Sequence, residues 1–429
     1  MENKQEQKTP LVMLVILASF ILFTTLPSIV LVNAGLIQFK IVELVGPQNV
    51  TAMYSLAAGI SGVAVVIMNP FGGFLADRTK AKFGRRRTWI VLGTVLGGLS
   101  MLLIAHAPSL PVLIIAYILM QFFYGMVFLS CYAMVPEQIE PEKFGKVSGI
   151  FGAVGPLGIM VGFMLEGPFA NVPVEQKIIV IAGIQFIVSI LSVLLLKDNP
   201  YEGKTNENKK FAINIKKIYP SVKKYPNFTW ALFTKLFMSM ANSSLNIMSI
   251  FYLTRFHMNQ AGVMQMNSRT SLAIVLLMIA GVVGGFLSDK IRKQKIFVIG
   301  SSLFSGICLI GFAFTNSLDF VVIATFAFNF SYGLFGAVDN ALVNRVLPSK
   351  EDTGKDIAII NTTTQLGSAI VSFATPTLLA IGVSTIGGDG YQMYFIAVAI
   401  TTVLAALTVL PIPELGAKEV SAEKEIAAE

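Results

Sequence analysis

Twelve long apolar segments constrain the fold of this chain more than any other feature of its sequence. The hydrocarbon core of a bilayer is about 30 Å thick, so a helix that crosses it needs about 20 apolar residues. All twelve segments reach that length, which predicts an all-α membrane protein with twelve transmembrane helices. The segments are residues 11–33, 50–76, 88–107, 111–135, 147–169, 178–197, 228–254, 267–287, 296–315, 319–344, 357–381 and 391–411.

The composition excludes a water-soluble fold. Of the 429 residues, 54% are hydrophobic and only 13% are charged, whereas soluble domains carry about 25% charged residues. Cys131 and Cys308 both lie inside apolar segments, so we interpret them as buried side chains rather than a disulfide or a metal site. We expect no cofactor, no bound metal and no enzymatic activity, because no nucleophile-elbow, zinc-protease or phosphate-loop motif stands out.

The distribution of basic residues predicts the orientation. With the N-terminus placed in the cytoplasm, 27 of the 32 Lys and Arg residues fall in cytoplasmic connections or tails. Only Lys40, Lys177, Arg255 and Arg269 fall outside, and Lys235 falls within a span. Because basic residues concentrate on the cytoplasmic side, we expect both termini there, in a multi-pass protein of the cell membrane. The charge of +8 then reflects contact with anionic lipid rather than nucleic acid.

The chain is internally repeated. A polar, Lys-rich linker, residues 198–227, separates a first half, 1–197, from a second, 228–411, and a tail follows at 412–429. The sequence GGFLADR closes the second span at 72–78, and GGFLSDK closes the eighth at 284–290. Similar six-span units in the same orientation predict two packed six-helix bundles, with substrate bound between them near the middle of the membrane.

The repeated segment resembles the signature loop of the major facilitator superfamily. Its first copy continues through a run of basic residues, Arg85 to Arg87, that would hold the loop at the cytoplasmic surface, and its glycines would let two helices approach closely. The resemblance covers essentially the whole chain and implies an alternating-access transporter. The residues that it assigns to conformational gating are Gly73, Asp77, Arg78, Gly84, Arg85, Arg86, Gly285 and Asp289.

Two patches are similar to a narrower branch, the glycoside–pentoside–hexuronide and sucrose transporters. One is the D-R-T-x4-G-R-R-R form of the loop at 77–87, and the other runs from Val338 through Pro348 to Asn361. This resemblance implies cation-coupled uptake of a sugar or glycoside. The first four spans lack the midspan carboxylates that many members of the branch carry, which favours a proton over sodium and leaves facilitated diffusion open.

Amides and aromatic hydroxyls on the spans are the candidate substrate contacts. In the seventh span Asn242 and Asn246 stand four residues apart with Ser239 and Ser249, on one face of a regular helix. Such groups suit a neutral, hydroxylated ligand, although they could instead tie neighbouring helices together. The candidates are Gln121, Tyr124, Asn242, Asn246, Asn329, Tyr332 and Gln365, with Asn33 and Tyr117 as further polar positions.

Ionisable groups inside the spans are the candidate coupling sites, because a coupling ion needs a group whose charge the other ligands can shift. They are Glu166, Lys235 and Asp339. For Asp339 the alternative is an ion pair with Arg345 at a cytoplasmic gate. Lys235 could instead extend its ammonium group to the membrane surface.

Two other functions remain open from the sequence. The abundant Phe (32 residues) and Met (18 residues) could line an adaptable apolar site in an exporter of drugs or amphiphiles. The glycines around Pro156 in the fifth span partly resemble an antiporter motif, although we interpret them as packing positions across the bundle interface. A transporter-like sensor is the remaining alternative.

Overall fold

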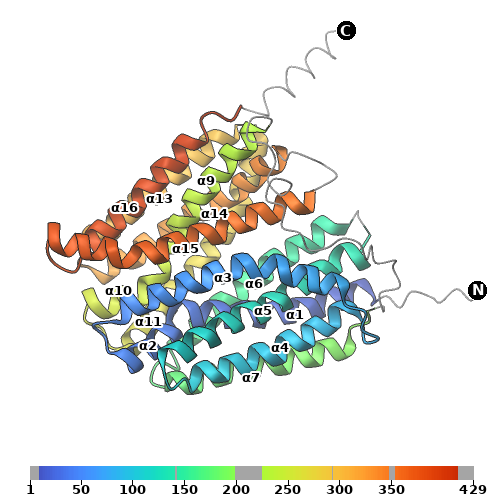
Figure 1. The fold of residues 1–429 in the computed structure, drawn as a ribbon. Coiled ribbons are helices and arrows are strands. Elements are labelled where there is room, and N and C mark those ends of the chain that lie inside the picture. Colours follow the sequence, from blue (N-terminus) through green and yellow to red (C-terminus); the bar gives the residue numbers. More distant parts are fainter. Residues whose placement is uncertain (1–8, 141–142, 199–224, 292, 347–352, 414–429) are drawn as a thin grey trace, which may run out of the picture. The chain divides into compact units, whose positions relative to one another are not determined.

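The computed structural model describes residues 9–140, 143–198, 225–291, 293–346 and 353–413, and every regular element in these ranges is a helix (Figure 1). Twelve helical segments are long and apolar enough to cross a membrane. The predicted fold class is therefore confirmed: the protein is all-α with twelve candidate membrane spans.

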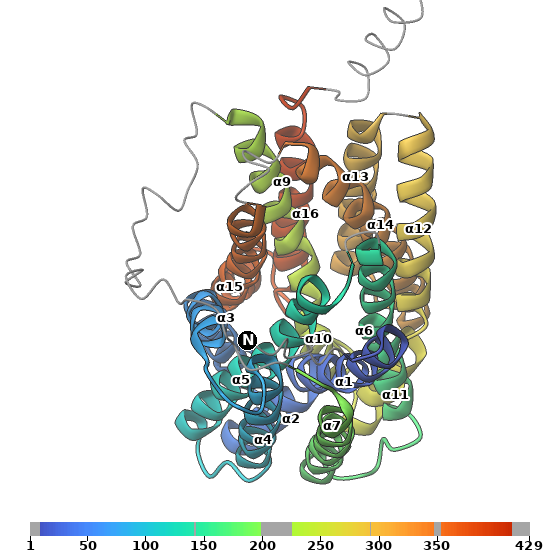
Figure 2. The same cartoon turned by 90° about the vertical axis from the view of Figure 1, so that its right-hand side faces the viewer.

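The described helices fall into two compact units. The first unit comprises the described parts of Met1–Ala212 together with Asn259–Ser271. Within it α4 packs against both α5 and α7, and α1 packs against α6 and α7 (Figure 2). Its helices are α1 (Leu11–Leu31), a π-helical segment (Val32–Leu36), α2 (Ile37–Val45), α3 (Val50–Arg78), α4 (Arg85–Ala105), α5 (Leu110–Gln138), α6 (Phe144–Glu166), α7 (Val174–Leu195) and α11 (Gln260–Thr270).

The second unit comprises the described parts of Ile213–Met258 and Leu272–Glu429. Within it α13 packs against α14 and α16, α12 packs against α14, and α9 packs against α15 and α16. The predicted bundle boundaries, 1–197 and 228–411, stay a prediction. The helices of this unit are α9 (Pro226–Ser243), a 3₁₀ segment (Ser244–Ile247), α10 (Met248–Arg255), α12 (Ala273–Ile291), α13 (Gln294–Phe314), α14 (Leu318–Arg345), α15 (Thr353–Thr385) and α16 (Tyr391–Thr408).

Apolar side chains cover the outside of these helices, and glycines bring their backbones together. Val12, Val282 and Phe286 are more than two-thirds exposed, which suits lipid rather than water. A Cβ atom at Gly158 of α6 would lie 2.4 Å from the carbonyl oxygen of Phe23 in α1. Gly155 and Gly162 also face α1, so for these three glycines the assignment to the bundle interface is wrong, while for Gly149 and Gly152 it stays a prediction.

The first and eighth spans are longer than predicted. The first helix continues through the π segment to Val45 and ends at Gly46, whose φ of +81° is not helical. Lys40, which we placed in an outside connection, is consequently a buried helical residue paired with Glu43 at 2.7 Å. The eighth span begins at Gln260 rather than 267, so Arg269 is also helical.

The seventh span is not a regular α-helix. It changes to 3₁₀ geometry at Ser244–Ile247 before α10 begins. A 3₁₀ turn has 3.0 residues rather than 3.6, so the spacing argument that placed Asn242 and Asn246 on one face of a regular helix is wrong. Asn242 ends up exposed and Asn246 half-buried.

Candidate functional site

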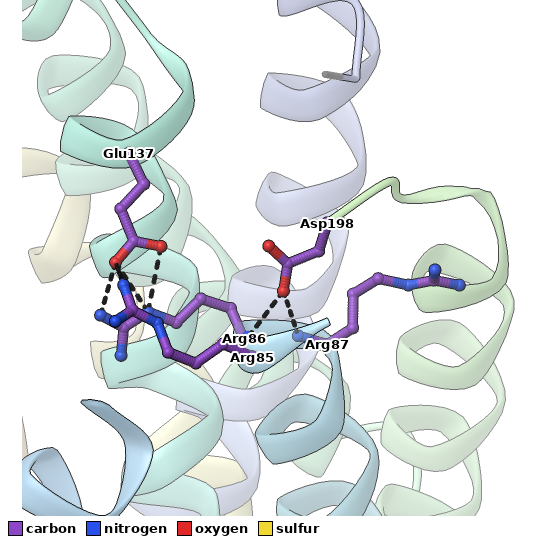
Figure 3. Close-up of polar contacts among 5 residues, drawn as sticks. All are labelled: Arg85, Arg86, Arg87, Glu137 and Asp198. Atoms are coloured by element: carbon purple, nitrogen blue, oxygen red, sulfur yellow. Dashed lines mark hydrogen bonds and ion pairs between the residues drawn. The ribbon is translucent and has the colours of Figure 1, made fainter. Parts of the chain in front are cut away.

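The loop between α3 and α4 is fixed by a carboxylate that follows α7. The first backbone N–H groups of a helix lack partners within the helix, and in α4 those of Arg86 and Arg87 donate to Asp198 Oδ2 at 2.7 and 3.2 Å (Figure 3). Gly84 precedes them with φ of +108°, and a Cβ atom there would lie 2.6 Å from Asp198. Burial raises the pKa of the Asp198 carboxyl, and the two N–H donors oppose that rise.

Two arginines of this loop converge on one acid of α5. Arg86 Nη2 lies 2.6 Å from Glu137 Oε1, and Arg86 Nε donates to both oxygens of that carboxylate at 3.1 and 3.2 Å (Figure 3). Arg85 bonds to the same carboxylate. Charge-assisted bonds of this kind are stronger and more directional than neutral ones, so Glu137 joins α5 to the start of α4.

The gating residues named from the sequence are only partly brought together. Arg85 and Arg86 share Glu137, and Gly84 leaves room for Asp198. The side chains of Asp77 and Asp289 lie outside the part that the structure describes. Arg78 is the last residue of α3, and its gating role stays a prediction.

The close helix approach that we expected of the repeated glycines is made by the first glycine of each pair. A Cβ atom at Gly72 would lie 2.3 Å from Met126 of α5, and one at Gly284 would lie 2.7 Å from Leu334 of α14. Gly73 faces open space, and at Gly285 the nearest atom is 3.8 Å away. The sequence could not separate two adjacent glycines, because helix rotation decides which one faces its neighbour.

A neutral polar cluster joins four elements of the first unit. Tyr54 of α3 donates to the carbonyl oxygen of Asn33 at 2.9 Å, and Tyr117 of α5 donates to the Asn33 side chain. Gln121 then donates to the Tyr117 hydroxyl at 3.3 Å, and Gln38 donates to the Asn33 carbonyl at 3.3 Å. Asn33 lies in the π-helical segment, and such segments frequently mark functional sites.

Tyr124 does not join this cluster. Its fully buried ring lies where a Cβ atom at Gly97 of α4 would come within 2.4 Å, and its hydroxyl contacts Met101 Sδ at 3.3 Å. It therefore packs α5 against α4, and we leave it out of the candidate site. Gln121, by contrast, lies about 16 Å along α5 from Leu110 at 1.5 Å per residue, near the middle of a span.

The second unit holds a buried ion pair that the sequence did not reveal. Lys235 of α9 contacts Asp339 Oδ2 of α14 at 2.8 Å and Asn340 Oδ1 at 3.1 Å. Asp339 is fully buried, and its Oδ1 has no hydrogen-bond partner among the described residues. Lys235 therefore does not extend to a membrane surface, and Asp339 pairs with it; the side chain of Arg345, the alternative partner, lies outside the described residues. In the sequence, the signal for this pair was that one span contains a basic residue and another contains an acidic one.

The remaining substrate candidates lie in α9, α14, α15 and the 3₁₀ segment of the second unit. Tyr332 stacks with Phe328 and Phe335, at ring distances of 6.2 and 6.1 Å. Asn329 donates to the carbonyl oxygen of Thr325 in its own helix at 2.9 Å. Gln365 of α15 is half-buried. As substrate contacts these residues stay individual predictions: Asn242, Asn246, Asn329, Tyr332 and Gln365.

Glu166, the third coupling candidate, is buried at the end of α6. Its Oε2 accepts a hydrogen bond from Asn267 of α11 at 2.9 Å. Lys177 of α7 is buried nearby and donates to the carbonyl oxygen of Ala170 at 3.0 Å. Neither neighbour was expected, because the apolar segments place Lys177 in a connection and Asn267 at the edge of a span.

Comparisons with known proteins agree on the family of the chain. A sequence model described as "Major Facilitator Superfamily" matches residues 9–372 and 265–429. The multi-drug resistance efflux pump PmrA of Streptococcus pneumoniae is 25% identical over 85% of this chain and 86% of its own length. The raffinose carrier protein of Pediococcus pentosaceus is 23% identical over 66% of this chain and 47% of its own length.

Solved structures show the same fold. The crystal structure of a D-xylose-proton symporter superposes with a TM-score of 0.73 and 15% identity, and covers 95% of this chain and 99% of the other. The crystal structure of a mutant of the nucleoside transporter NupG gives a TM-score of 0.71 and 12% identity, and covers 93% of this chain and 99% of the other.

Proposed function

The chain belongs to the major facilitator superfamily, and from that premise we propose that it takes up a sugar or glycoside together with a proton by alternating access. As a member of this family it is a transporter rather than an enzyme, and a multi-pass protein of the cell membrane that binds small-molecule substrates. The sugar, the proton, the direction and the cytoplasmic placement of both termini are the parts that we propose.

The neutral cluster of the first unit is the observation that carries the proposal. Asn33, Tyr54, Tyr117 and Gln121 present amides and hydroxyls, with no charged group among them. Sites built from such groups select ligands with hydroxyls, because a ligand without them leaves the buried polar groups unpaired. The hydrogen bonds within the cluster hold Gln121 in place, so we propose that its amide contacts the substrate. Similarity to a raffinose carrier is in keeping with a sugar.

In the second unit we propose that Asn242, Asn246 and Gln365 supply further contacts. The 3₁₀ segment follows Asn242 and contains Asn246, and a 3₁₀ stretch in the middle of a helix often marks a functional hinge. Asn242 is exposed, so its amide is available to a ligand. Asn329 and Tyr332 are weaker candidates, since each already uses its side chain within α14.

The loop after α3 is the proposed gate. Glu137 and Asp198 hold the start of α4 by separate contacts, so movement of α5 or α7 would be transmitted to the loop. We propose that Gly84, Arg85 and Arg86 control the rate of conformational exchange rather than contact the substrate.

Ligand-induced thermal shifts of the purified chain test the substrate class. The panel contains mono-, di- and trisaccharides, glycosides, and amphiphilic cations such as ethidium. We expect a saccharide to raise the melting temperature, and an imposed inward proton gradient to drive its accumulation in proteoliposomes. Gln121→Ala should abolish the shift, while Tyr124→Phe should retain it. Stabilisation by the cations alone would overturn the proposal.

An exporter of drugs is the second candidate function, and one observation favours it. The efflux pump PmrA matches 85% of this chain, a larger share than the raffinose carrier matches. Under this alternative ethidium would be expelled from cells expressing the chain, and Gln121→Ala would not affect its efflux.

A further inference from the structure

A buried carboxyl lies at the end of α6, where α11 packs against this helix. Glu166 is the last residue of α6 and only 6% exposed. One oxygen, Oε2, accepts the amide hydrogen bond from Asn267 at 2.9 Å. The other, Oε1, has no hydrogen-bond partner among the residues that the structure describes. The site thus holds an acid with half of its hydrogen-bonding capacity unused.

The groups around this carboxyl are nearly all neutral. On the face of α6 that leads to Glu166, α1 contributes apolar side chains, with Leu31 against Gly162 and Pro27 against Gly158. Arg269 of α11 is exposed. Lys177 of α7 is the charged group that interacts electrostatically with Glu166, yet its ammonium is bonded to the Ala170 carbonyl and Met264 Sδ.

Such surroundings favour the neutral form of the acid. A buried carboxylate is stable when several donors or a bonded cation compensate its charge, and otherwise it takes up a proton. Glu166 has one amide donor, and the nearby cation is engaged elsewhere. A carboxylic acid can remain in this position, while a carboxylate would require either water or a rearranged Lys177.

The helix that carries Asn267 is a distinct segment of its span. α11 belongs to the first compact unit, whereas α12, which continues the same span, belongs to the second. A turn at residues 271–272 separates them. α11 packs against α6 (Figure 2). Asn267 bonds Glu166, and Ser268 Oγ donates to the carbonyl oxygen of Met164 at 2.8 Å, so two adjacent side chains hold α11 on α6.

We propose that Glu166 is a proton-binding site that α11 opens and closes. The carboxyl carries its proton while Asn267 bonds it. When α11 separates from α6, water reaches the acid, its O–H bond breaks, the proton passes to water, and the carboxylate remains beside Lys177. The inference rests on the proposed function in one respect: this proton would be the coupling ion of the transporter.

Infrared difference spectroscopy of the full chain in lipid nanodiscs, without any substrate, tests the proton site directly. At pH 7 we expect a carboxylic-acid C=O stretching band that disappears in Glu166→Gln. Asn267→Leu should shift the band, because the hydrogen bond to Oε2 is lost. The control is Glu175→Gln, since Glu175 is an acid at the start of α7 whose side chain is 45% exposed and paired with His106; it should leave the band unchanged. A spectrum of Glu166→Gln identical to that of the natural sequence would overturn the inference.

Spin-label distances test whether the proton controls α11. Labels replace Leu165 of α6 and Gln265 of α11, both exposed, in a chain without Cys131 and Cys308. Between pH 5 and pH 9 we expect the closed-distance population to fall as pH rises, and to stay high at both pH values in Glu166→Gln. Equal closed-distance populations at both pH values in the labelled chain that retains Glu166 would contradict the inference. Because no substrate is present, a positive result combined with no sugar transport would reject only the sugar proposal.

Discussion

Two polar clusters, one in each unit, differ in kind. In the first unit, Asn33, Tyr54, Tyr117 and Gln121 form a chain of neutral hydrogen bonds, whereas in the second Lys235 and Asp339 form a buried ion pair. Neutral donors and acceptors recognise hydroxyl groups without a large desolvation penalty. A buried pair of charges responds to a proton or a cation, because changing one charge leaves the other uncompensated. We therefore propose that the neutral cluster serves recognition, and that the Lys235–Asp339 pair is, beside Glu166, a second candidate for coupling.

The ion pair should show the largest effect. Asp339→Asn leaves the Lys235 ammonium buried without its counter-charge, and removing one partner of a buried pair lowers the free energy of unfolding by about 3–5 kcal/mol. The double substitution Lys235→Met with Asp339→Leu removes both charges and should restore most of that stability. Thermal unfolding of the natural sequence, the single variant and the double variant measures these changes in the free energy of unfolding.

The double variant also tests whether the ion pair takes part in coupling. If the pair couples a proton, the double variant folds but no longer accumulates substrate under a proton gradient. Full gradient-driven accumulation by the double variant would reduce the pair to a structural role.

The neutral cluster should show the next largest effect. Tyr117→Phe removes the hydroxyl that joins Asn33 to Gln121, and leaving buried polar groups unpaired costs about 1–3 kcal/mol. Tyr124→Phe is the matched control, because its hydroxyl contacts the weakly accepting sulfur atom of Met101; it should change stability and affinity little. Equal effects of the two substitutions would mean that the cluster has no special role.

Asn242 tests whether the second unit also contributes to recognition. Because the residue is exposed, Asn242→Ala should change the free energy of unfolding by less than about 0.5 kcal/mol, yet lower substrate affinity by about 1 kcal/mol, as expected for a lost hydrogen bond. Affinity and melting temperature measured on the same preparation separate the two quantities. Unchanged affinity would confine substrate recognition to the first unit.

Glu137 should show the smallest effect on substrate affinity. Its side chain is 29% exposed, and solvent weakens ion pairs, so Glu137→Gln should lower the free energy of unfolding by less than about 1 kcal/mol. Transport should slow several-fold while equilibrium affinity stays within a few-fold, because the residue holds the loop and does not contact substrate. Transport rate and ligand affinity are the two measurements, and a lost affinity with unchanged rate would contradict the gating role.

The sequence by itself determined the number of spans, the family and the repeat. These follow from apolar segment length and from local motifs such as GGFLADR and GGFLSDK, which depend on neighbouring residues along the chain. It also identified Lys235, Asp339 and Glu166 as unusual, since charges inside spans are costly and therefore stand out.

Only the tertiary structure decided how those residues pair. Lys235 meets Asp339 from a helix more than one hundred positions away, and Glu166 meets Asn267 at a similar separation. Helix rotation selected Gly72 over Gly73, and a local change to 3₁₀ geometry moved Asn246 off its expected face. The physical reason is that a helical period gives the relative direction of side chains only within one regular helix, while pairing depends on how separate helices rotate and approach.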